Sequence, residues 1–262
     1  MLLTEINQYP VKSMKGVSHT TSLVDHFGIK DDRRWMLVDQ QGRFITQRKH
    51  PLLSTISVSK NDSSLIFTTL NGEVLSVNAD CLTRQIDVTV WGDTVSACCA
   101  DQSVGEWFSS LLGLPVHLVY MPETTFRQVD RQFADYEQRV SFVDGFPFLL
   151  ISESSLTDLN QRLENTVSMA RFRPNLVVSG CDAYAEDDWR RIRIGQLEFE
   201  VVKPCSRCIM ITLDERTLTY GKEPLKTLAS YRRNEFGACF GQNLVHQSTG
   251  VLTVGDRVEV LE

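Results

Sequence analysis

The chain has 262 residues, of which 42% are hydrophobic and 23% are charged, a composition typical of one large or two modest globular domains. Its net charge of −6 lacks the positive field that sequence-independent nucleic-acid binding needs, so no nucleic-acid partner is expected. The N-terminus does not resemble an export signal, and no uncharged apolar run approaches membrane-spanning length. We therefore expect a soluble, cytoplasmic protein without a membrane partner.

The first third of the chain reads as strands joined by tight turns. Residues 35–38 and 43–46 are expected to form two strands on either side of a turn. A stronger hairpin signal lies at residues 65–69 and 74–77, because the intervening Asn71-Gly72 pair supplies the positive φ angles of a type I′ turn. This part of the chain is predicted to be all-β.

One helix and one further strand are expected before the middle of the chain. Ser103 and Glu106 have the spacing of a capping box. The apolar face of this helix comprises Val104, Trp107, Phe108, Leu111 and Leu112. A strand at residues 116–120 precedes a polar stretch, and we place a domain boundary there, giving units at 1–119 and 120–262.

The second unit is expected to contain two helices, a buried strand and two hairpins. The helices are placed at residues 153–163 and 224–231, the strand at 176–178, and the hairpins at 192–201 and 251–260. The predicted fold class is mixed α/β and β-rich. It consists of an N-terminal β-barrel-like domain and a second β-barrel domain with a few peripheral helices.

Chemistry is most strongly indicated by Cys205-Ser206-Arg207-Cys208, which follows an alternating strand and precedes an expected strand at residues 209–213. A thiolate beside a guanidinium suits soft-metal ligation or nucleophilic sulfur chemistry. The seven cysteines are an odd number, which disfavours a secreted disulfide framework. A zinc site would need a second ligand pair, a thioredoxin-like site would need a following helix, and an incidental pair stays open.

Cationic segments elsewhere leave two interpretations open. Arg171, Arg173 and Asn175 precede a strand and could bind a phosphate through forked donors, or could line a solvated edge. The loop at residues 9–16 and the pair Arg33-Arg34 allow the same two interpretations.

Six segments in this order resemble the MOSC family, named for the C-terminal domain of molybdenum cofactor sulfurase, with its N-terminal β-barrel partner domain. The branch with the greatest similarity is that of the amidoxime-reducing components and their bacterial relatives. The segments are YPVKSMKG (9–16), DRRWMLVD (32–39), FRPNLVVSGCDAYAEDDW (172–189), CSRCIMITLD (205–214), KEPLKTLASYR (222–232) and FGQN (240–243).

The resemblance implies a molybdenum cofactor whose metal is ligated by Cys208, the second cysteine of the C-x-x-C element. It further implies that the pterin and its phosphate are held by Lys12, Ser13, Arg33, Arg173, Asn175, Ser206 and Arg207. Asp144 lies in a loop that approaches the metal in relatives, although Gly145 and Phe146 depart from the small polar residues found there. Asp144 and Asp182 are the candidate acid–base residues, and Cys181 is expected to be a small buried residue.

The resemblance also implies a reductase of N-hydroxylated compounds, with the redox chemistry supplied by the cofactor. The chain has no C-x₄-C-x₂-C spacing, so no intrinsic iron–sulfur cluster is expected and electrons would come from a separate ferredoxin- or flavoprotein-type donor. Pyridoxal phosphate is not expected. Two alternatives stay open, namely a carrier of persulfide sulfur on Cys208 or Cys205 and a non-catalytic carrier of the cofactor.

Overall fold

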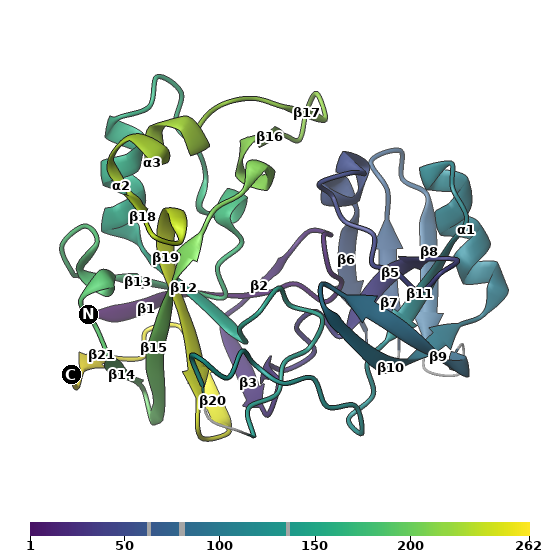
Figure 1. The fold of residues 1–262 in the computed structure, drawn as a ribbon, viewed down its shortest axis with the longest axis horizontal. Helices are drawn as coiled ribbons and strands as arrows, with labels where there is room; N and C mark the ends of the chain where they lie inside the picture. Colours follow the sequence, from purple (N-terminus) through teal and green to yellow (C-terminus); the bar gives the residue numbers. More distant parts are fainter. Residues whose placement is uncertain (62–63, 79–81, 135–136) are drawn as a thin grey trace.

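The fold is dominated by β-strands, which confirms the predicted mixed α/β, β-rich class. The computed structural model describes residues 1–61, 64–78, 82–134 and 137–262. Figure 1 shows two lobes side by side. The lobe on the left, here called the first lobe, has both chain termini on its outer side, and the lobe on the right is called the second lobe. Closure of either lobe into a barrel stays a prediction.

The first lobe is built on a nine-stranded sheet in the order β2-β1-β13-β12-β19-β15-β14-β21, with β18 paired to β19. The strands are β1 (Leu2–Gln8), β2 (Val17–His19), β12 (Phe148–Ser152), β13 (Leu176–Ser179), β14 (Arg191–Ile194), β15 (Leu197–Ser206), β18 (Arg233–Asn234), β19 (Gly237–His246) and β21 (Val258–Val260). Neighbouring strands are antiparallel except β12 and β13. Because β1 pairs with β13, the loop that follows β1 lies beside the loop that precedes β13.

A three-stranded sheet in the order β20-β3-β4 completes this lobe, and it again joins the two ends of the sequence. Its strands are β3 (Thr21–Asp25), β4 (Gly28–Ile29) and β20 (Gly250–Thr253). The first strands of the chain therefore share sheets with strands from its last third. The proposed boundary between residues 119 and 120 stays a prediction about the two sequence units.

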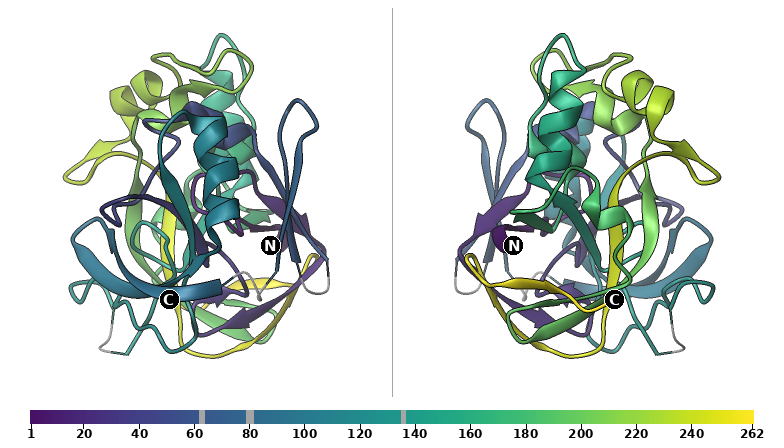
Figure 2. Two further views of the ribbon diagram at one scale, coloured as in Figure 1. Left: turned by 90° about the vertical axis from the view of Figure 1, so that its right-hand side faces the viewer. Right: turned by 90° about the vertical axis from the view of Figure 1, so that its left-hand side faces the viewer.

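The second lobe contains a four-stranded sheet in the order β5-β11-β10-β9 and a three-stranded sheet in the order β6-β7-β8. The strands are β5 (Trp35–Asp39), β6 (Ser57–Lys60), β7 (Ser64–Thr68), β8 (Val74–Asn78), β9 (Leu82–Val90), β10 (Asp93–Ala100) and β11 (Val116–Tyr120). Helix α1 (Gln102–Leu112) packs on β11 at the outer edge of the lobe (Figures 1 and 2).

The remaining helices cover one end of the first lobe (Figure 2). They are α2 (Glu153–Gln161), α3 (Leu225–Tyr231) and the 3-10 turns η3 (Met169–Phe172), η4 (Ala185–Asp187) and η5 (Ile209–Thr212), while η1 (Pro51–Thr55) belongs to the second lobe. A two-stranded ribbon of β16 (Leu213–Asp214) and β17 (Thr219–Tyr220) extends toward the second lobe (Figure 1). Within the described ranges, no helix is both long enough and apolar enough to span a membrane.

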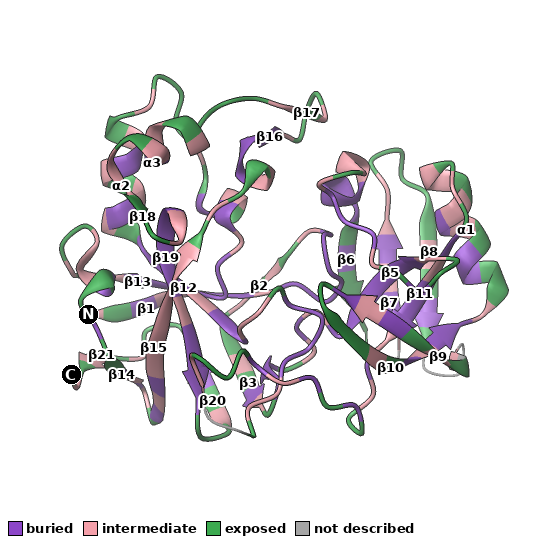
Figure 3. Ribbon diagram, in the orientation of Figure 1, coloured by how far each residue is buried: buried purple, intermediate pink, exposed green. Residues whose placement is uncertain are grey.

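Each lobe has its own buried apolar core (Figure 3). The first is centred on residues such as Phe148 and Phe199, whose rings meet edge to face, and the second on Phe67 and Phe108 in the same arrangement. The apolar face predicted for α1 packs into the second core, with Phe108 fully buried. Burial of these faces, at about 25 cal/mol per Å² of apolar surface, is the main force that holds each lobe together.

Most expected elements are confirmed. They include the strands at residues 35–38, 116–120 and 176–178, the hairpins at 65–77 and 192–201, and the helices that begin at residues 153 and 225. Leu159 and Leu228 are the buried apolar residues of these two helices.

Two local predictions are wrong, one at the start of α1 and one at residues 209–213. The capping box at Ser103 does not form; α1 begins at Gln102 with Asp101 at the N-cap position, and the Asp101 side chain makes no capping hydrogen bond. The strand expected at residues 209–213 is a 3-10 turn followed by β16, because the Thr212 hydroxyl donates a hydrogen bond to the Ile209 carbonyl (2.8 Å).

One predicted pairing is wrong, because each of its two segments pairs with another strand. β20 pairs with β3, and β21 pairs with β14, so residues 251–260 do not form a closing hairpin. The connection at Gly255 bonds instead to the Leu3 carbonyl on β1 (2.8 Å). The pairing expected between residues 35–38 and 43–46 forms only in part. Phe44 makes an antiparallel bridge to Val38, and the Ile45 amide donates a hydrogen bond to the Leu37 carbonyl (2.8 Å), but residues 43–46 are not a regular strand.

Candidate functional site

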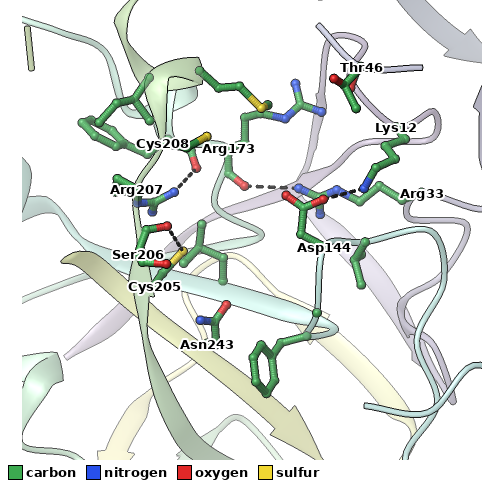
Figure 4. A pocket seen from close by; sticks show the side chains of 18 of the residues that line it. Lys12, Arg33, Thr46, Asp144, Arg173, Cys205, Ser206, Arg207, Cys208 and Asn243 are labelled. Carbon is green, nitrogen blue, oxygen red and sulfur yellow. Dashed lines mark hydrogen bonds and ion pairs between the residues drawn. The ribbon is translucent and has the colours of Figure 1, made fainter. Parts of the chain in front are cut away.

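A cleft between the two lobes gathers nearly all of the residues proposed for the site (Figure 4). Those that line it are Lys12, Ser13, Arg33, Asp144, Arg173, Asn175, Ser206, Arg207 and Cys208. Asp182 is exposed and does not line the cleft, and Cys181 is half-buried against the core of the first lobe. The proposed residues thus come together from distant segments, with Asp182 as the exception.

The loop after β1 delivers Lys12 and Ser13, both of which are buried. It is attached to the second lobe, because the Lys12 amide donates a hydrogen bond to the Trp35 carbonyl (2.8 Å). Ser13, Arg33 and Arg173 all have positive φ angles, of 72°, 46° and 57°. Such backbone strain costs about 1 to 3 kcal/mol at each residue and is concentrated at functional sites, so three strained residues in one cleft make it the candidate site.

Lys12 and Asp144 form an ion pair across the cleft, with 2.6 Å between Nζ and Oδ1. The ammonium also donates to the Phe142 carbonyl (2.7 Å). Burial lowers the pKa of Lys12, although Asp144 opposes this. Enclosure by the cleft would by itself raise the pKa of Asp144, but the Lys12 charge and hydrogen bonds from Lys12 and Trp91 hold that pKa well below its usual range. Asp144 is therefore a carboxylate at neutral pH.

Two arginines that line the cleft converge on the buried ring of Tyr9. The guanidinium carbons of Arg33 and Arg173 lie 4.3 Å and 4.2 Å from the ring centre. Arg33 is neutralised by Asp32 (2.6 Å) and also donates to the side-chain oxygen of Asn175 (3.2 Å). No carboxylate among the residues that the structure describes pairs with Arg173, and burial together with the nearby Arg33 charge lowers its pKa to about 10. Both guanidinium groups remain charged at neutral pH.

The guanidinium of Arg173 is only partly satisfied. Its Nη1 donates to the Met14 carbonyl (2.7 Å), but its Nη2 is buried without a hydrogen-bond partner among the described residues. An unpaired buried charged donor is costly unless a ligand completes it. An anionic group, such as the phosphate of a pterin cofactor, fits this donor and the cationic lining of the cleft.

The C-x-x-C element lies on the opposite side of the cleft from Lys12 (Figure 4). Cys208 is exposed to the cleft, whereas Cys205 is half-buried and burial raises the pKa of its thiol. Arg207 anchors the turn, because its guanidinium donates to the backbone carbonyls of Phe240 (2.7 and 2.9 Å) and Phe172 (3.0 Å). This arrangement makes Cys208 the accessible thiol of the pair.

Sequence reasoning missed several residues of the cleft. Thr46, Arg48 and Asn243 line it, and Arg48 reaches to 4.0 Å from the Cys208 sulfur and 3.8 Å from the Met210 sulfur. Trp91 supports the cleft by donating a hydrogen bond to Asp144 (3.1 Å). An aromatic residue in a tight Trp-Gly turn was the available signal for Trp91, while a single arginine in a loop gave none for Arg48.

Metal ligation by side chains alone is not indicated in the parts of the chain that the structure describes. Across residues 1–61, 64–78, 82–134 and 137–262, no group of three or more His, Cys, Asp or Glu side chains is placed to hold a metal ion.

Two family models match the chain. The MOSC domain matches residues 137–259, and the MOSC N-terminal beta barrel domain matches residues 1–115. Together these matches span both lobes. The chain belongs to the family of MOSC-domain proteins that carry this N-terminal domain.

Curated relatives within the family are similar over nearly the whole chain. Mitochondrial amidoxime-reducing component 1 of Homo sapiens is 35% identical, with 97% of this chain and 81% of the relative covered. Mitochondrial amidoxime reducing component 2 of Rattus norvegicus is 34% identical over 95% of this chain and 80% of the relative. Molybdenum cofactor sulfurase of Oryza sativa subsp. japonica is 36% identical over 91% of this chain but only 32% of the relative.

Proposed function

We propose that this protein is a molybdenum cofactor-dependent reductase of small N-hydroxylated compounds. The observation that carries the proposal is the buried, unpaired Nη2 of Arg173 in a cationic cleft that also contains the exposed thiol of Cys208. A multiply anionic pterin cofactor with one open ligand position matches both features. The names of the relatives, amidoxime-reducing components, support the same reaction class.

Each residue has a proposed role in holding the cofactor. Cys208 provides the protein ligand to molybdenum. Arg173 and Arg33 bind the phosphate, with Asn175 orienting Arg33 through its side-chain oxygen (3.2 Å). The remaining pterin contacts come from Lys12, Ser13 and Ser206, while Arg207 fixes the turn that carries Cys208.

The bound cofactor supplies the two-electron redox chemistry. The net reaction cleaves the N–O bond of an amidoxime, consumes two electrons and two protons, and releases an amidine and water. Asp144 is held as a carboxylate, so it accepts hydrogen bonds from the substrate and does not supply a proton at neutral pH. Electrons come from a separate ferredoxin- or flavoprotein-type donor, and we propose a cytoplasmic location.

Metal and pterin analysis tests the proposal. The wild type, Cys208→Ala and Cys205→Ala are expressed in a molybdate-supplemented host, and molybdenum and pterin are measured in the folded proteins. We expect near-stoichiometric molybdenum in the wild type and in Cys205→Ala, and loss of molybdenum in Cys208→Ala. The loaded proteins are then assayed with benzamidoxime and an artificial electron donor. Folded wild type that contains neither molybdenum nor pterin would contradict the proposal.

A sulfur-carrier function is the second candidate, and the similarity to a molybdenum cofactor sulfurase favours it. In that case the accessible Cys208 would carry a persulfide and transfer sulfur to a metal cofactor. Mass spectrometry of the purified wild type distinguishes the two functions. A persulfide on Cys208, together with no reduction of benzamidoxime by molybdenum-loaded protein, would favour the carrier.

A further inference from the structure

Trp91 occupies an unusual position for a large aromatic residue. It lies in the two-residue turn between β9 and β10, has a φ of +56° and is 45% exposed. A bulky residue at positive φ is a genuine backbone outlier, and exposure of an indole forgoes the favourable burial of its ring. A two-residue hairpin turn calls for a positive φ at its first position, but it does not call for a large aromatic side chain there, so the contacts of the indole are informative.

The indole connects two opposite charges of the cleft. Its Nε1 donates a hydrogen bond to Asp144 Oδ1 (3.1 Å), and the guanidinium carbon of Arg48 lies 5.1 Å from its ring centre. The Phe44 ring packs against it with 5.1 Å between ring centres. One side chain thus restrains both Asp144, which approaches from the loop before β12, and Arg48, which extends toward the sulfur of Cys208.

The two oxygens of Asp144 are used unequally. Lys12 Nζ (2.6 Å) and Trp91 Nε1 (3.1 Å) both donate to Oδ1. No hydrogen bond to Oδ2 is formed by the residues that the structure describes, and the Asp144 side chain is 65% exposed. Because Oδ1 is fixed twice, Oδ2 is a preoriented acceptor that stays available to a ligand in the cleft.

We propose that Trp91 is a positioning residue that holds Asp144 and Arg48 as the two walls of a substrate subsite selective for N-hydroxylated groups bearing an N–H donor. The inference rests on the proposed function. An amidoxime, C(NH₂)=N–OH, has an amino group that can donate to Asp144 Oδ2, whereas an N,N-dialkylated amidoxime has none. The apolar side chains of Val143, Phe146 and Leu149 line the same cleft and can cover the hydrocarbon part of such a substrate.

Paired substrates test the subsite. We compare kcat/KM for benzamidoxime and N,N-dimethylbenzamidoxime in molybdenum-loaded wild type and Trp91→Phe, with Trp107→Phe on α1 as a matched control. Phenylalanine keeps an aromatic ring but removes the hydrogen bond to Asp144. We expect kcat/KM for benzamidoxime to fall about 10-fold in Trp91→Phe, because hydrogen bonds to charged groups are worth more than neutral ones. The dimethyl compound should change less than about 2-fold, and Trp107→Phe should match the wild type.

Binding of benzamidine, measured by calorimetry, tests the subsite without turnover. Its amidinium should bind the wild type and lose about 10-fold in affinity in Trp91→Phe. An equal loss of kcat/KM with both amidoximes, or unchanged benzamidine affinity in Trp91→Phe, overturns the inference. If the loaded wild type reduces neither amidoxime, the proposed function fails. Benzamidine binding then decides alone, and a wild type that does not bind it overturns the subsite as well.

Discussion

The guanidinium carbon of Arg173 lies 4.2 Å from the centre of the Tyr9 ring. Arg33 lies at a similar distance from the same ring, so two cations share one aromatic side chain in a buried site. Cation–π attraction offsets part of their repulsion, but the Arg33 charge still lowers the pKa of Arg173, and Nη2 of Arg173 has no hydrogen-bond partner among the described residues. The site is therefore preorganised for an anion at the expense of stability without one.

Replacement of Arg173 by methionine tests this preorganisation. We expect Arg173→Met to lose most of its molybdenum and pterin, because methionine has similar length but no donor for a phosphate. Inorganic phosphate should stabilise the cofactor-free wild type by about 1 to 2 kcal/mol when well above its Kd, and should not stabilise Arg173→Met. Thermal unfolding and metal analysis measure the two effects. The exposed Arg190→Met is the control, and full cofactor content in Arg173→Met would contradict the prediction.

Tyr9 gives a prediction at alkaline pH. Burial raises the pKa of Tyr9 to about 12, although the charges of Arg173 and Arg33 oppose the rise. The folded state therefore favours the neutral phenol. The resulting stability is fully present below the ordinary tyrosine pKa of about 10 and is lost as pH rises through about 12.

Comparison of wild type with Tyr9→Phe isolates this contribution. Urea unfolding between about pH 9 and pH 12 should show a steeper loss of stability in the wild type, by about 2 to 3 kcal/mol over the interval. Tyr9→Phe loses the hydrogen bond to the Pro174 carbonyl (3.2 Å). This loss lowers the free energy of unfolding by a constant amount at every pH at which Tyr9 is protonated. Parallel pH profiles for the two proteins would show that Tyr9 does not titrate in this way.

Local patterns predicted those elements whose partner lies nearby in the sequence. The strands on either side of Asn71-Gly72 and of Gly195-Gln196 pair as expected, because short turns define their register. The predicted type I′ turn is wrong, because Gly72 has a positive φ (82°) but Asn71 does not. Residues 251–260 have the same alternation, yet they separate onto β3 and β14. Alternation specifies which face of a strand is buried but not which strand is its neighbour, so long-range pairing could not be predicted.

The site was predicted mainly through resemblance and not through residue chemistry. The charge pattern around Arg173 favoured a solvated edge, and only the pairing of β1 with β13 brings Arg173 close to Met14. Gly16 illustrates the same limit. A Cβ at this position would lie 2.5 Å from the Tyr9 ring, a constraint that no local pattern reveals.

Residues that reach the cleft from the second lobe were the hardest to predict. The loops of Arg48 and Trp91 give no sequence signal for what these residues contact, because their proximity to Cys208 and Asp144 depends on how the lobes pack together. Sequence spacing cannot report a contact of this kind, since its members are more than 50 residues apart.

The final prediction concerns the pH dependence of catalysis. Hydrogen bonds and charge from Lys12, with the hydrogen bond from Trp91, outweigh the effect of enclosure and hold the pKa of Asp144 well below its usual range. Asp144 thus stays ionised across about pH 5 to 8. We expect Asp144→Asn to lower kcat/KM for benzamidoxime by about 10-fold or more without shifting the acid limb of the pH profile. In Lys12→Met the pKa of Asp144 should rise, so protonation of Asp144 should move the acid limb toward neutral pH. An acid limb that moves in Asp144→Asn would instead identify Asp144 as a group that exchanges a proton during turnover.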